Sequence, residues 1–521
     1  LSVFLTYQGT LLEKITAKNS QSVTIREVEL TYDNGVPVEL VKDGDQSTKL
    51  TFSYQDSGKG YPLGNISWPI GGSNYDYFSI PGSGAEYRTT RTNAQGKFIH
   101  YDYDSVGNLI RIDYPKLFGQ STGSAVITLG YDSNRNLTSW SDTITTLSMS
   151  YNSLGLLTSL TDNAGRSFSY TYSGADLTGI SDGLGTLYSV SYADQSNPHS
   201  PTSITDASSN SWSYAYNQYG QLTSVTPPTP SGGITYEYDE VTSSPRYGWL
   251  KRYENGAGNE LSFDTYSPLG DVLSVTSFPA SGVQNTTTYQ YDAMRRLTRV
   301  THPDSKFEEL SYTGANLTEI ADEAGTVSEF DYCPIRGKLT GAQYPLAKGL
   351  SWNLNGDFNN TSFLDGRNNQ TSYTRLDGGE LRRITYPDNL QIDYSYRRPG
   401  EVLTEGPSTL ALRYNYDAAG RTTGVSLTGN TTYQIQYSYR ADDLPSQIVD
   451  QVSNRTFTYS SNRRLEKVEY DLSGEGISNV QELTYSYNAD GSVSTLTWKN
   501  GTTTVASWEY SYDGAGRVTE I

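Results

Sequence analysis

Cysteine, histidine and methionine are nearly absent from this sequence, which has one Cys, three His and two Met among 521 residues. The single cysteine, Cys333, excludes an internal disulfide framework and a zinc site built from several thiolates. No apolar run reaches the length that a bilayer-spanning helix needs, so we expect no membrane insertion by this chain. Hydrophobic residues make up only 35% of the total, which argues against an ordinary core of aliphatic side chains.

Positive charge is also scarce. The chain has 38 Lys and Arg residues against 57 Asp and Glu residues, and its formal net charge is −19. Such an excess of negative charge repels phosphate backbones, so nucleic acid is not expected as a partner. The sequence shows neither a glycine-rich phosphate-binding motif nor a calcium-binding loop. It therefore predicts no cofactor and no metal.

Tyrosine is the residue present in excess, with 44 copies. Many of them begin a unit that reads Tyr-Asp, two variable residues and often Gly. Self-similarity at a nearly fixed period indicates a stack of equivalent supersecondary units. The clearest copies, which supply the predicted structural repeat residues, contain Tyr103, Asp104 and Gly107, then Tyr291 and Asp292, then Tyr416, Asp417 and Gly420, and finally Tyr512, Asp513 and Gly516.

The spacing of these units is that of a β-hairpin. From Tyr103 onward, the lead residues follow one another at intervals of 20 to 28 residues, which leaves room for two short strands and two turns. Aromatic residues alternate with small ones before the lead residue, as in Trp212, Tyr214 and Tyr216, and therefore share one face of a strand. The Asp or Asn after the lead residue suits the start of a tight turn, and the Gly accepts left-handed backbone angles.

The repeat is regular over residues 101–521 and degenerate over residues 1–100, and we predict two regions with these limits. The N-terminal region is expected to hold irregular repeats with Gly- and Pro-rich loops. Between residues 55 and 86 the pattern gives way to Gly, Pro, Ser and Tyr, which predicts long loops or a degenerate unit.

Both ends of the chain carry parts of the pattern. Tyr7, Gly9 and Leu12 have the spacing of a shorter variant of the unit. Val518 and Ile521 fill two slots of a unit that is not completed. These positions predict that the array continues beyond the C-terminal residue.

The tyrosine-led units resemble the YD repeats of bacterial Rhs (rearrangement hotspot) proteins, the C subunits of insecticidal toxin complexes, wall-associated proteins and the animal teneurins. The resemblance covers most of the chain from about Tyr101 and is looser before it. It implies an all-β fold in which about twenty hairpin units form a spiralling, hollow β-shell. In that family the shell often houses a toxic domain or presents an adhesive surface. The family's closing Arg-Tyr-Tyr-Asp-Pro-like segment is absent here, so self-cleavage and an enclosed payload are not implied.

No group of residues predicts catalysis. His100 precedes a strand, whereas His199 and His302 lie beside prolines in loops. Cys333 follows a lead tyrosine, in the slot that Asp or Asn usually fills. Structural roles account for these residues better than a nucleophile or base, which would need a positioned partner. We therefore predict that the chain is not an enzyme.

Three tryptophans, Trp68, Trp249 and Trp498, fall outside the main slots of the repeat. Exposed indole rings can stack on sugar rings while nearby Asn and Asp bind the hydroxyl groups, so these residues are candidate carbohydrate contacts. The interpretation we favour is that they fill gaps between turns.

The sequence thus predicts a non-catalytic shell or scaffold segment of a large secreted or cell-surface bacterial protein, which encloses or presents another domain in toxin delivery or adhesion. The expected partners are other domains of the same polypeptide, with a glycan or a cell-surface receptor as a further candidate. One alternative is a carbohydrate-binding module for cell-surface, plant or algal polysaccharide. A less favoured alternative is a polysaccharide-degrading enzyme on a repeat scaffold.

Overall fold

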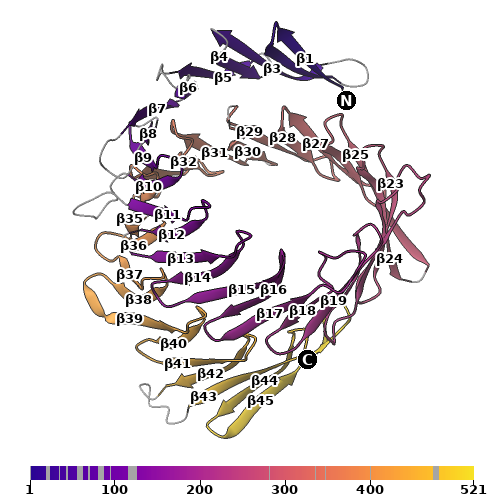
Figure 1. Ribbon diagram of the computed structural model, residues 1–521, viewed down its shortest axis with the longest axis vertical. Coiled ribbons are helices and arrows are strands. Elements are labelled where there is room, and N and C mark those ends of the chain that lie inside the picture. The colour runs from indigo at the N-terminus through magenta and orange to yellow at the C-terminus, as the bar shows by residue number, and fades with distance from the viewer. Residues whose placement is uncertain are drawn as a thin grey trace. The chain divides into compact units, whose positions relative to one another are not determined.

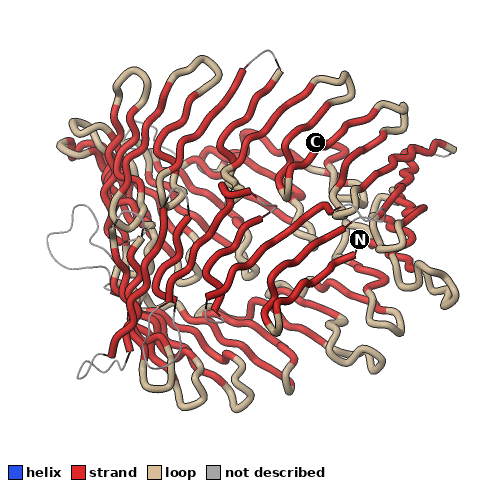
Figure 2. The backbone as a smooth tube through the Cα atoms, turned by 90° about the horizontal axis from the view of Figure 1, so that it is seen from above, coloured by secondary structure: helices blue, strands red, loops and turns tan. Residues whose placement is uncertain are grey.

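Every regular element of the computed structural model is a β-strand (Figures 1 and 2). No helix occurs among the described residues, and the all-β prediction is confirmed. The structure describes residues 2–18, 24–33, 36–42, 45–54, 63–68, 71–79, 87–93, 96–114, 126–142, 144–280, 282–334, 336–345, 348–398, 400–472 and 480–521. Of the irregular segment predicted at 55–86, residues 63–68 and 71–79 form strands, and the rest lies outside the described residues.

The chain divides into two compact units, each built from two separate stretches of sequence. Unit 1 contains residues 1–130 and 289–411, and unit 2 contains residues 131–288 and 412–521. We call the first stretch of each unit its early row and the second its later row. The strands β11 (Val126–Tyr131) and β25 (Val283–Tyr291) run across the limits of these stretches.

Unit 1 is a succession of short strands in both rows. Its early row contains β1 (Ser2–Gln8), β2 (Leu11–Lys18), β3 (Thr24–Asp33), β4 (Val36–Lys42), β5 (Asp45–Tyr54), β6 (Leu63–Trp68), β7 (Gly71–Ser79), β8 (Tyr87–Thr92), β9 (Phe98–Tyr103) and β10 (Leu109–Asp113). Its later row contains β26 (Leu297–Thr301), β27 (Phe307–Thr313), β28 (Asn316–Ala321), β29 (Val327–Tyr332), β30 (Leu339–Tyr344), β31 (Lys348–Leu354), β32 (Asn360–Leu364), β33 (Gln370–Arg375), β34 (Leu381–Thr385), β35 (Gln391–Arg398) and β36 (Glu401–Gly406).

Unit 2 has the same organisation. Its early row contains β12 (Leu137–Ser141), β13 (Thr146–Tyr151), β14 (Leu157–Asp162), β15 (Ser167–Ser173), β16 (Asp176–Asp182), β17 (Gly185–Ser191), β18 (Ser203–Asp206), β19 (Ser211–Tyr216), β20 (Leu222–Thr226), β21 (Ile234–Tyr238), β22 (Leu250–Glu254), β23 (Glu260–Tyr266) and β24 (Val272–Ala280). Its later row contains β37 (Leu412–Tyr416), β38 (Thr422–Leu427), β39 (Asn430–Tyr439), β40 (Pro445–Val449), β41 (Asn454–Tyr459), β42 (Leu465–Asp471), β43 (Gln481–Tyr487), β44 (Val493–Asn500), β45 (Thr503–Glu509), β46 (Ser511–Tyr512) and β47 (Val518–Glu520).

Strands that follow one another in sequence pair antiparallel, and in most of the repeat hairpins a register shift marks the lead residue. In the hairpin of β13 and β14, Ser150 lies opposite Ser159, but Tyr151 lies opposite Leu157. The hairpin of β15 and β16 has the same shift between Thr171 and Tyr172. A bulge of this kind bends the strand and increases its twist. The repeat therefore places a bulge beside the lead residue in most of its hairpins.

The side chain after the lead tyrosine closes the turn. Numbering slots from Tyr103 as zero, the carboxylate of Asp104 at slot +1 accepts hydrogen bonds from the N–H groups of Val106 at +3 (3.0 Å) and Asn108 at +5 (2.8 Å). Gly107 at slot +4 has φ 88°, a left-handed conformation that glycine adopts without a steric penalty. The Tyr-Asp-x-x-Gly pattern is thus a turn whose backbone donors are satisfied by its own first side chain.

The other predicted repeat residues build the same turn. Asp292, Asp417 and Asp513 each accept N–H groups at slots +3 and +5, and their second carboxylate oxygen accepts from Arg296, Arg421 and Arg517 at 2.7, 2.7 and 2.8 Å. Hydrogen bonds from the Arg517 backbone and side chain hold the pKa of Asp513 below its usual value. Gly420 and Gly516 occupy slot +4 with φ values of 83° and 79°.

In many units the hydroxyl of the lead tyrosine ties the unit to the one before it. It donates to a backbone carbonyl at the start of the preceding return strand, at 2.6–3.0 Å in seven regular units. These pairs are Tyr151 with Leu137, Tyr172 with Leu157, Tyr238 with Leu222, Tyr312 with Leu297, Tyr439 with Thr422, Tyr487 with Leu465 and Tyr512 with Val493. We call this bond the tyrosine tether.

The tether also occurs in the N-terminal region. Tyr32 donates to the carbonyl of Leu12 at 2.7 Å, and Tyr54 donates to the carbonyl of Pro37 at 2.8 Å. The shorter unit that begins at Tyr7 therefore supplies a carbonyl, that of Leu12, which accepts a tyrosine tether as the carbonyl of a regular unit does. The division at residue 100 stays a prediction.

Among the described residues few side chains are fully buried, and these residues form no aliphatic core of ordinary size. The buried hydrophobic residues are Val41, Cys333, Ala342, Phe358, Leu376, Tyr396 and Val468. The accessible surface is 28884 Å², against about 19,000 Å² for a compact protein of this mass. Along the strands before the lead tyrosines, half-buried residues alternate with exposed ones, as the period-two pattern predicts. Backbone ladders and tethers therefore carry much of the stability.

Tyr172→Phe tests the tether, because it removes the hydroxyl and keeps the ring. The change leaves the carbonyl of Leu157 without this donor, so we expect the free energy of unfolding to fall by about 0.5–1.5 kcal/mol. Urea unfolding followed by circular dichroism measures the loss. Tyr170→Phe, two residues earlier on the same strand, is the matched control and should change stability by much less. Equal effects of the two changes would contradict the role of the tether.

Candidate functional site

The turns of each row form two edges. We call the turns that follow the lead tyrosines the tyrosine edge, and the turns at the other ends of the strands the opposite edge. In unit 2, the opposite edge of the early row contacts the tyrosine edge of the later row, and we call this contact the seam. Its contacts join Thr145 to Ala418, Arg166 to Asp443, Asp182 to Arg463, Ser208 to Ser461, Ser231 to Asp490, and Gly232 to Gly514.

Arg463 is the centre of one charged cluster in the seam. Its guanidinium lies 2.7 Å from a carboxylate oxygen of Asp182 in the early row and 2.9 Å from one of Asp442 in its own row. Both carboxylates are only 5% exposed, and the arginine side chain is 18% exposed. Burial alone would raise the pKa of Asp182, but hydrogen bonds from Arg463 and from the Leu184 N–H lower it below its usual value. The cluster is therefore a desolvated, charge-balanced contact between the rows.

A second cluster joins the rows through Asp443. Its carboxylate lies 2.5 Å from Arg166 of the early row and 2.9 Å from Arg421 of the later row. Each arginine also binds the carboxylate of its own turn, Arg166 that of Asp162 at 2.5 Å and Arg421 that of Asp417 at 2.7 Å. Arg166 thus closes its own turn and reaches the neighbouring row with the same guanidinium, whereas Arg421 reaches the next turn of its own row.

Asp443 and Arg463, which form ion pairs across the seam, both stand at slot +4, where the repeat prefers glycine. Asp443 has φ 67° and Arg463 has φ 66°. A non-glycine residue in this conformation costs about 1 kcal/mol or more. From this slot the side chain reaches the covering row, and its ion pair offsets the cost of the conformation.

The rows of unit 1 meet through an aromatic contact, and here too a left-handed residue at slot +4 of the later row reaches the early row. Phe358 stands at slot +4 of its turn with φ 61°, and its ring centroid lies 5.4 Å from that of Trp68 in the early row. The indole N–H of Trp68 donates to the carbonyl of Gly356 at 3.1 Å. Lys97 of the early row and Asp377 of the later row add an ion pair at 3.0 Å. The structure thus places Trp68 between two rows.

Three glycines allow the backbone of unit 2 to pass closely at one point. The N–H of Gly232 donates to the carbonyl of Gly514 at 3.0 Å. A Cβ atom at Gly514 would lie 1.8 Å from the carbonyl oxygen of Gly256, and a Cβ at Gly256 would meet the oxygen of Gly514 at 2.1 Å. No residue with a side chain fits at these positions without a shift of the backbone.

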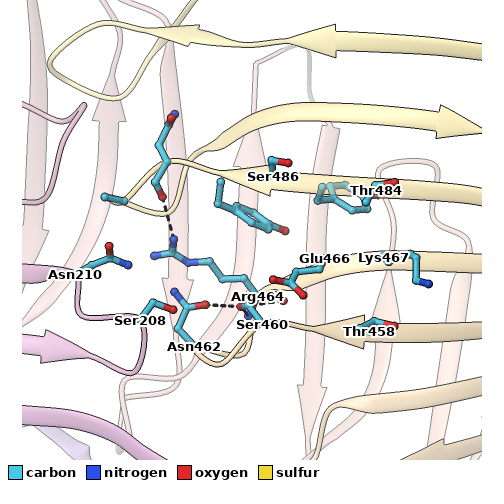
Figure 3. Close-up of a pocket in the computed structure, with 14 residues that line it drawn as sticks. Ser208, Asn210, Thr458, Ser460, Asn462, Arg464, Glu466, Lys467, Thr484 and Ser486 are labelled. Atoms are coloured by element: carbon cyan, nitrogen blue, oxygen red, sulfur yellow. Dashed lines mark hydrogen bonds between the residues drawn. The ribbon is translucent and has the colours of Figure 1, made fainter. Parts of the chain in front are cut away.

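A polar groove of about 740 Å³ borders the seam (Figure 3). Figure 3 shows Ser208 and Asn210 of the early row on one side and Thr484 and Ser486 of β43 on the other. Arg464 crosses the groove and donates to the carbonyl of Asn488 at 3.1 Å. The fourteen lining residues include no histidine or cysteine and one carboxylate, that of Glu466. The groove can hold water or a polar chain, but its lining lacks a nucleophile with a positioned base.

The remaining two predicted carbohydrate contacts differ in exposure. Trp249 packs against Tyr266, with ring centroids 5.0 Å apart, and its ring lies 3.5 Å from the position a Cβ would take at Gly270. Trp498 is 38% exposed, and its indole N–H donates to the side-chain oxygen of Gln481 at 3.1 Å. Of the three tryptophans, Trp498 alone presents a ring to solvent to this extent.

The histidines and the cysteine lie apart from one another. His100 contacts Thr90 at 2.7 Å, and burial lowers its pKa. His199 lies 2.9 Å from Asp176, and His302 lies 3.7 Å from Glu323. Cys333 is buried, and its backbone N–H and carbonyl close the turn.

The described part of the chain offers neither a metal-binding cluster nor a membrane-spanning helix. No group of three or more His, Cys, Asp or Glu side chains there could hold a metal ion. The same residues include no helix long and apolar enough to cross a membrane.

The seam residues were not identified from the sequence. Arg166, Asp443 and Arg463 belong to turns that are ordinary members of the repeat. The signal that could have found two of them is a charged residue at slot +4, where a residue other than glycine is strained.

Arg463→Ala tests the seam, because it leaves the nearly buried carboxylates of Asp182 and Asp442 without their shared cation. We expect a loss of about 3 kcal/mol in the free energy of unfolding, measured by urea denaturation. Arg463→Gly is the matched control, because it breaks the same ion pairs but relieves the left-handed strain. It should therefore be less damaging than the alanine variant by about 1 kcal/mol. Loss of less than about 0.5 kcal/mol in Arg463→Ala would show that the pair contributes no more than a surface contact.

Comparison with known proteins gives one family and one fold. Residues 120–332 match the family model described as Teneurin YD-shell. No curated protein sequence matches the chain. Among solved structures, the TcdB2-TccC3 complex is similar with a TM-score of 0.53 at 13% identity, over 95% of this chain and 31% of that chain. The Photorhabdus luminescens Tc holotoxin pore is similar at 13% identity with a TM-score of 0.35, over 99% of this chain and 29% of that chain.

The likeness to the TcdB2-TccC3 complex shows the fold alone, and this chain spans about a third of the length of that chain, 31%. The family model matches a stretch that begins in the early row of unit 1 and includes the whole early row of unit 2. The tyrosine-led units, the antiparallel hairpins and this match agree with the resemblance inferred from the repeat. The chain carries tyrosine-led repeats, and over residues 120–332 it is similar to the Teneurin YD-shell family.

Proposed function

We propose that this chain forms part of the wall of a YD-repeat shell, a non-catalytic scaffold in a large secreted or cell-surface bacterial polypeptide. The wall encloses or presents another domain of that polypeptide. Toxin delivery and adhesion are the two roles in which such a wall serves, and containment is the one we favour. The spiralling, hollow form of the shell is part of this proposal.

The observation that carries the proposal is the way the sheets are held together. Tyrosine tethers act within the sheet, from one hairpin to the next, and the seams act from the edge of one row to the edge of another. Neither kind of contact needs a second layer packed on a face of the sheet. Few hydrophobic residues are buried, and the accessible surface is 28884 Å². A sheet stabilised in its own plane is suited to border a space.

Protection of an attached domain from protease tests containment. We expect trypsin to leave the enclosed domain of the intact natural polypeptide uncut while the shell is folded, and to digest it once the shell unfolds in urea. Time courses analysed by mass spectrometry measure both rates. Digestion of every domain outside this chain at the same rate in the folded and unfolded states would contradict containment and leave presentation as the role.

Recognition of a polysaccharide is the second candidate function, and the exposure of Trp498 favours it. The indole is held by Gln481, and Trp508 on the neighbouring strand is also 38% exposed. Leu496 lies opposite Trp508 and Trp498 lies opposite Ala506, so the two tryptophans are diagonal neighbours on one face of the sheet.

Sedimentation with insoluble plant, algal and bacterial polysaccharides tests this candidate. If the site exists, Trp498→Ala should reduce the bound fraction by about tenfold, because an aromatic ring stacked on a sugar is lost. Tyr188→Ala, which removes a ring 46% exposed on another strand, should leave binding unchanged. An absence of binding to all the polysaccharides would remove the candidate.

A further inference from the structure

The tyrosine edge of the early row in unit 2 carries large apolar side chains at one repeated slot. Four of its turns have such a residue at slot +3, namely Leu154, Tyr219, Val241 and Leu269, which are 64%, 49%, 60% and 61% exposed, whereas the turn after Tyr131 has Asn134 there. In each of the four turns the N–H of the apolar residue donates to the side chain at slot +1, which is Asn152, Asn217, Asp239 or Ser267, at 3.0–3.2 Å. The turns are therefore fixed, and the four apolar side chains project from them into solvent.

The same slot has different chemistry where a row covers it. In the later row of unit 2, slot +3 is occupied by Asp442, Asn462 and Asp490 in three turns and by Ala419 and Ala515 in two others. Asn462 donates to Asp206 of the early row at 3.2 Å, and Asp490 accepts from Ser231 at 2.5 Å. Asp442 binds Arg463, which pairs with Asp182 of the early row. In these three turns slot +3 therefore faces the covering row with a polar group matched to it.

The tyrosine edge of the early row is thus built from the same turns as the covered edge of the later row. It exposes apolar side chains, and no row among the described residues of unit 2 covers it. In both units, the contact that covers a tyrosine edge comes from the opposite edge of another row. The opposite edge of the later row in unit 2 exposes apolar side chains of its own, Val452 at 49% and Val480 at 44%.

We propose that the tyrosine edge of the early row of unit 2 is a docking edge for a second copy of this chain, which binds through the opposite edge of its later row. The interface continues the arrangement of the seam, with apolar contacts in place of ion pairs. Because two different edges meet, the association is head-to-tail and does not close on two subunits. The inference does not depend on containment, since it rests on the edges alone.

The charge of the chain predicts how the proposed association depends on salt. Each copy has a net charge of −19, so two copies repel one another at low ionic strength. Salt screens this repulsion and leaves apolar contacts intact. We therefore expect association to strengthen as sodium chloride is raised.

Sedimentation velocity over a range of protein concentrations tests the proposal. The weight-average mass should rise above the 57.5 kDa of one chain and keep rising with concentration. The double variant Leu154→Asp with Leu269→Asp should weaken association by on the order of tenfold or more, because charge is placed on the apolar edge. Tyr188→Asp, at a residue 46% exposed in the middle of β17 and away from both edges, is the matched control and should associate like the unmodified chain.

Three results would overturn the proposal. One is a mass of 57.5 kDa at every concentration and salt, which would leave a different partner as the occupant of the edge. Another is a closed dimer whose mass stops rising. The third is equal association of the double variant and the unmodified chain.

Discussion

The tyrosine tether is the interaction on which the rest of the structure depends. A hairpin of five- to seven-residue strands is marginal by itself in water, because it buries little and leaves its outer strand unpaired. The tether adds a fixed hydrogen bond from the aromatic ring of one hairpin to the return strand of the hairpin before it, as Tyr172 does with Leu157. Since a tether of this kind recurs in many of the repeats, a chain with few buried aliphatic residues can still hold a long series of strands.

A structure stabilised in this way has its strong contacts in the plane of the sheet and at the ends of the strands. The seam of unit 2 follows the same logic, because Arg463 joins Asp182 and Asp442 at the turns and covers no sheet face. The need for contacts between rows is visible in the sequence at slot +4. Glycine is favoured there on conformational grounds, and Asp443 and Arg463 replace it where a side chain must reach the neighbouring row.

The repeat, the hairpins and the turn chemistry could be predicted from the sequence, because they depend on residues close together in the chain. Asp104 and Gly107 act within one turn, and spacing alone reveals them. The tether was not predicted, since its acceptor is a backbone carbonyl that carries no sequence signal. The seam was not predicted because its partners are far apart, as with Asp182 and Arg463, separated by 281 residues. The interpretation of Trp68 and Trp249 as packing residues agrees with their ring contacts, whereas the exposure of Trp498 depends on the position of its strand.

The most direct test of the account is a structure of the natural polypeptide by cryo-electron microscopy, at a resolution that shows tyrosine side chains. The account predicts tethers in successive hairpins and one face of the sheet bordering a space that the side chains of this chain do not fill. Density for a second layer packed tightly on both faces of the sheet would contradict it. In that case stability would come from a buried core, and neither the tethers nor a wall that borders a space would explain the fold.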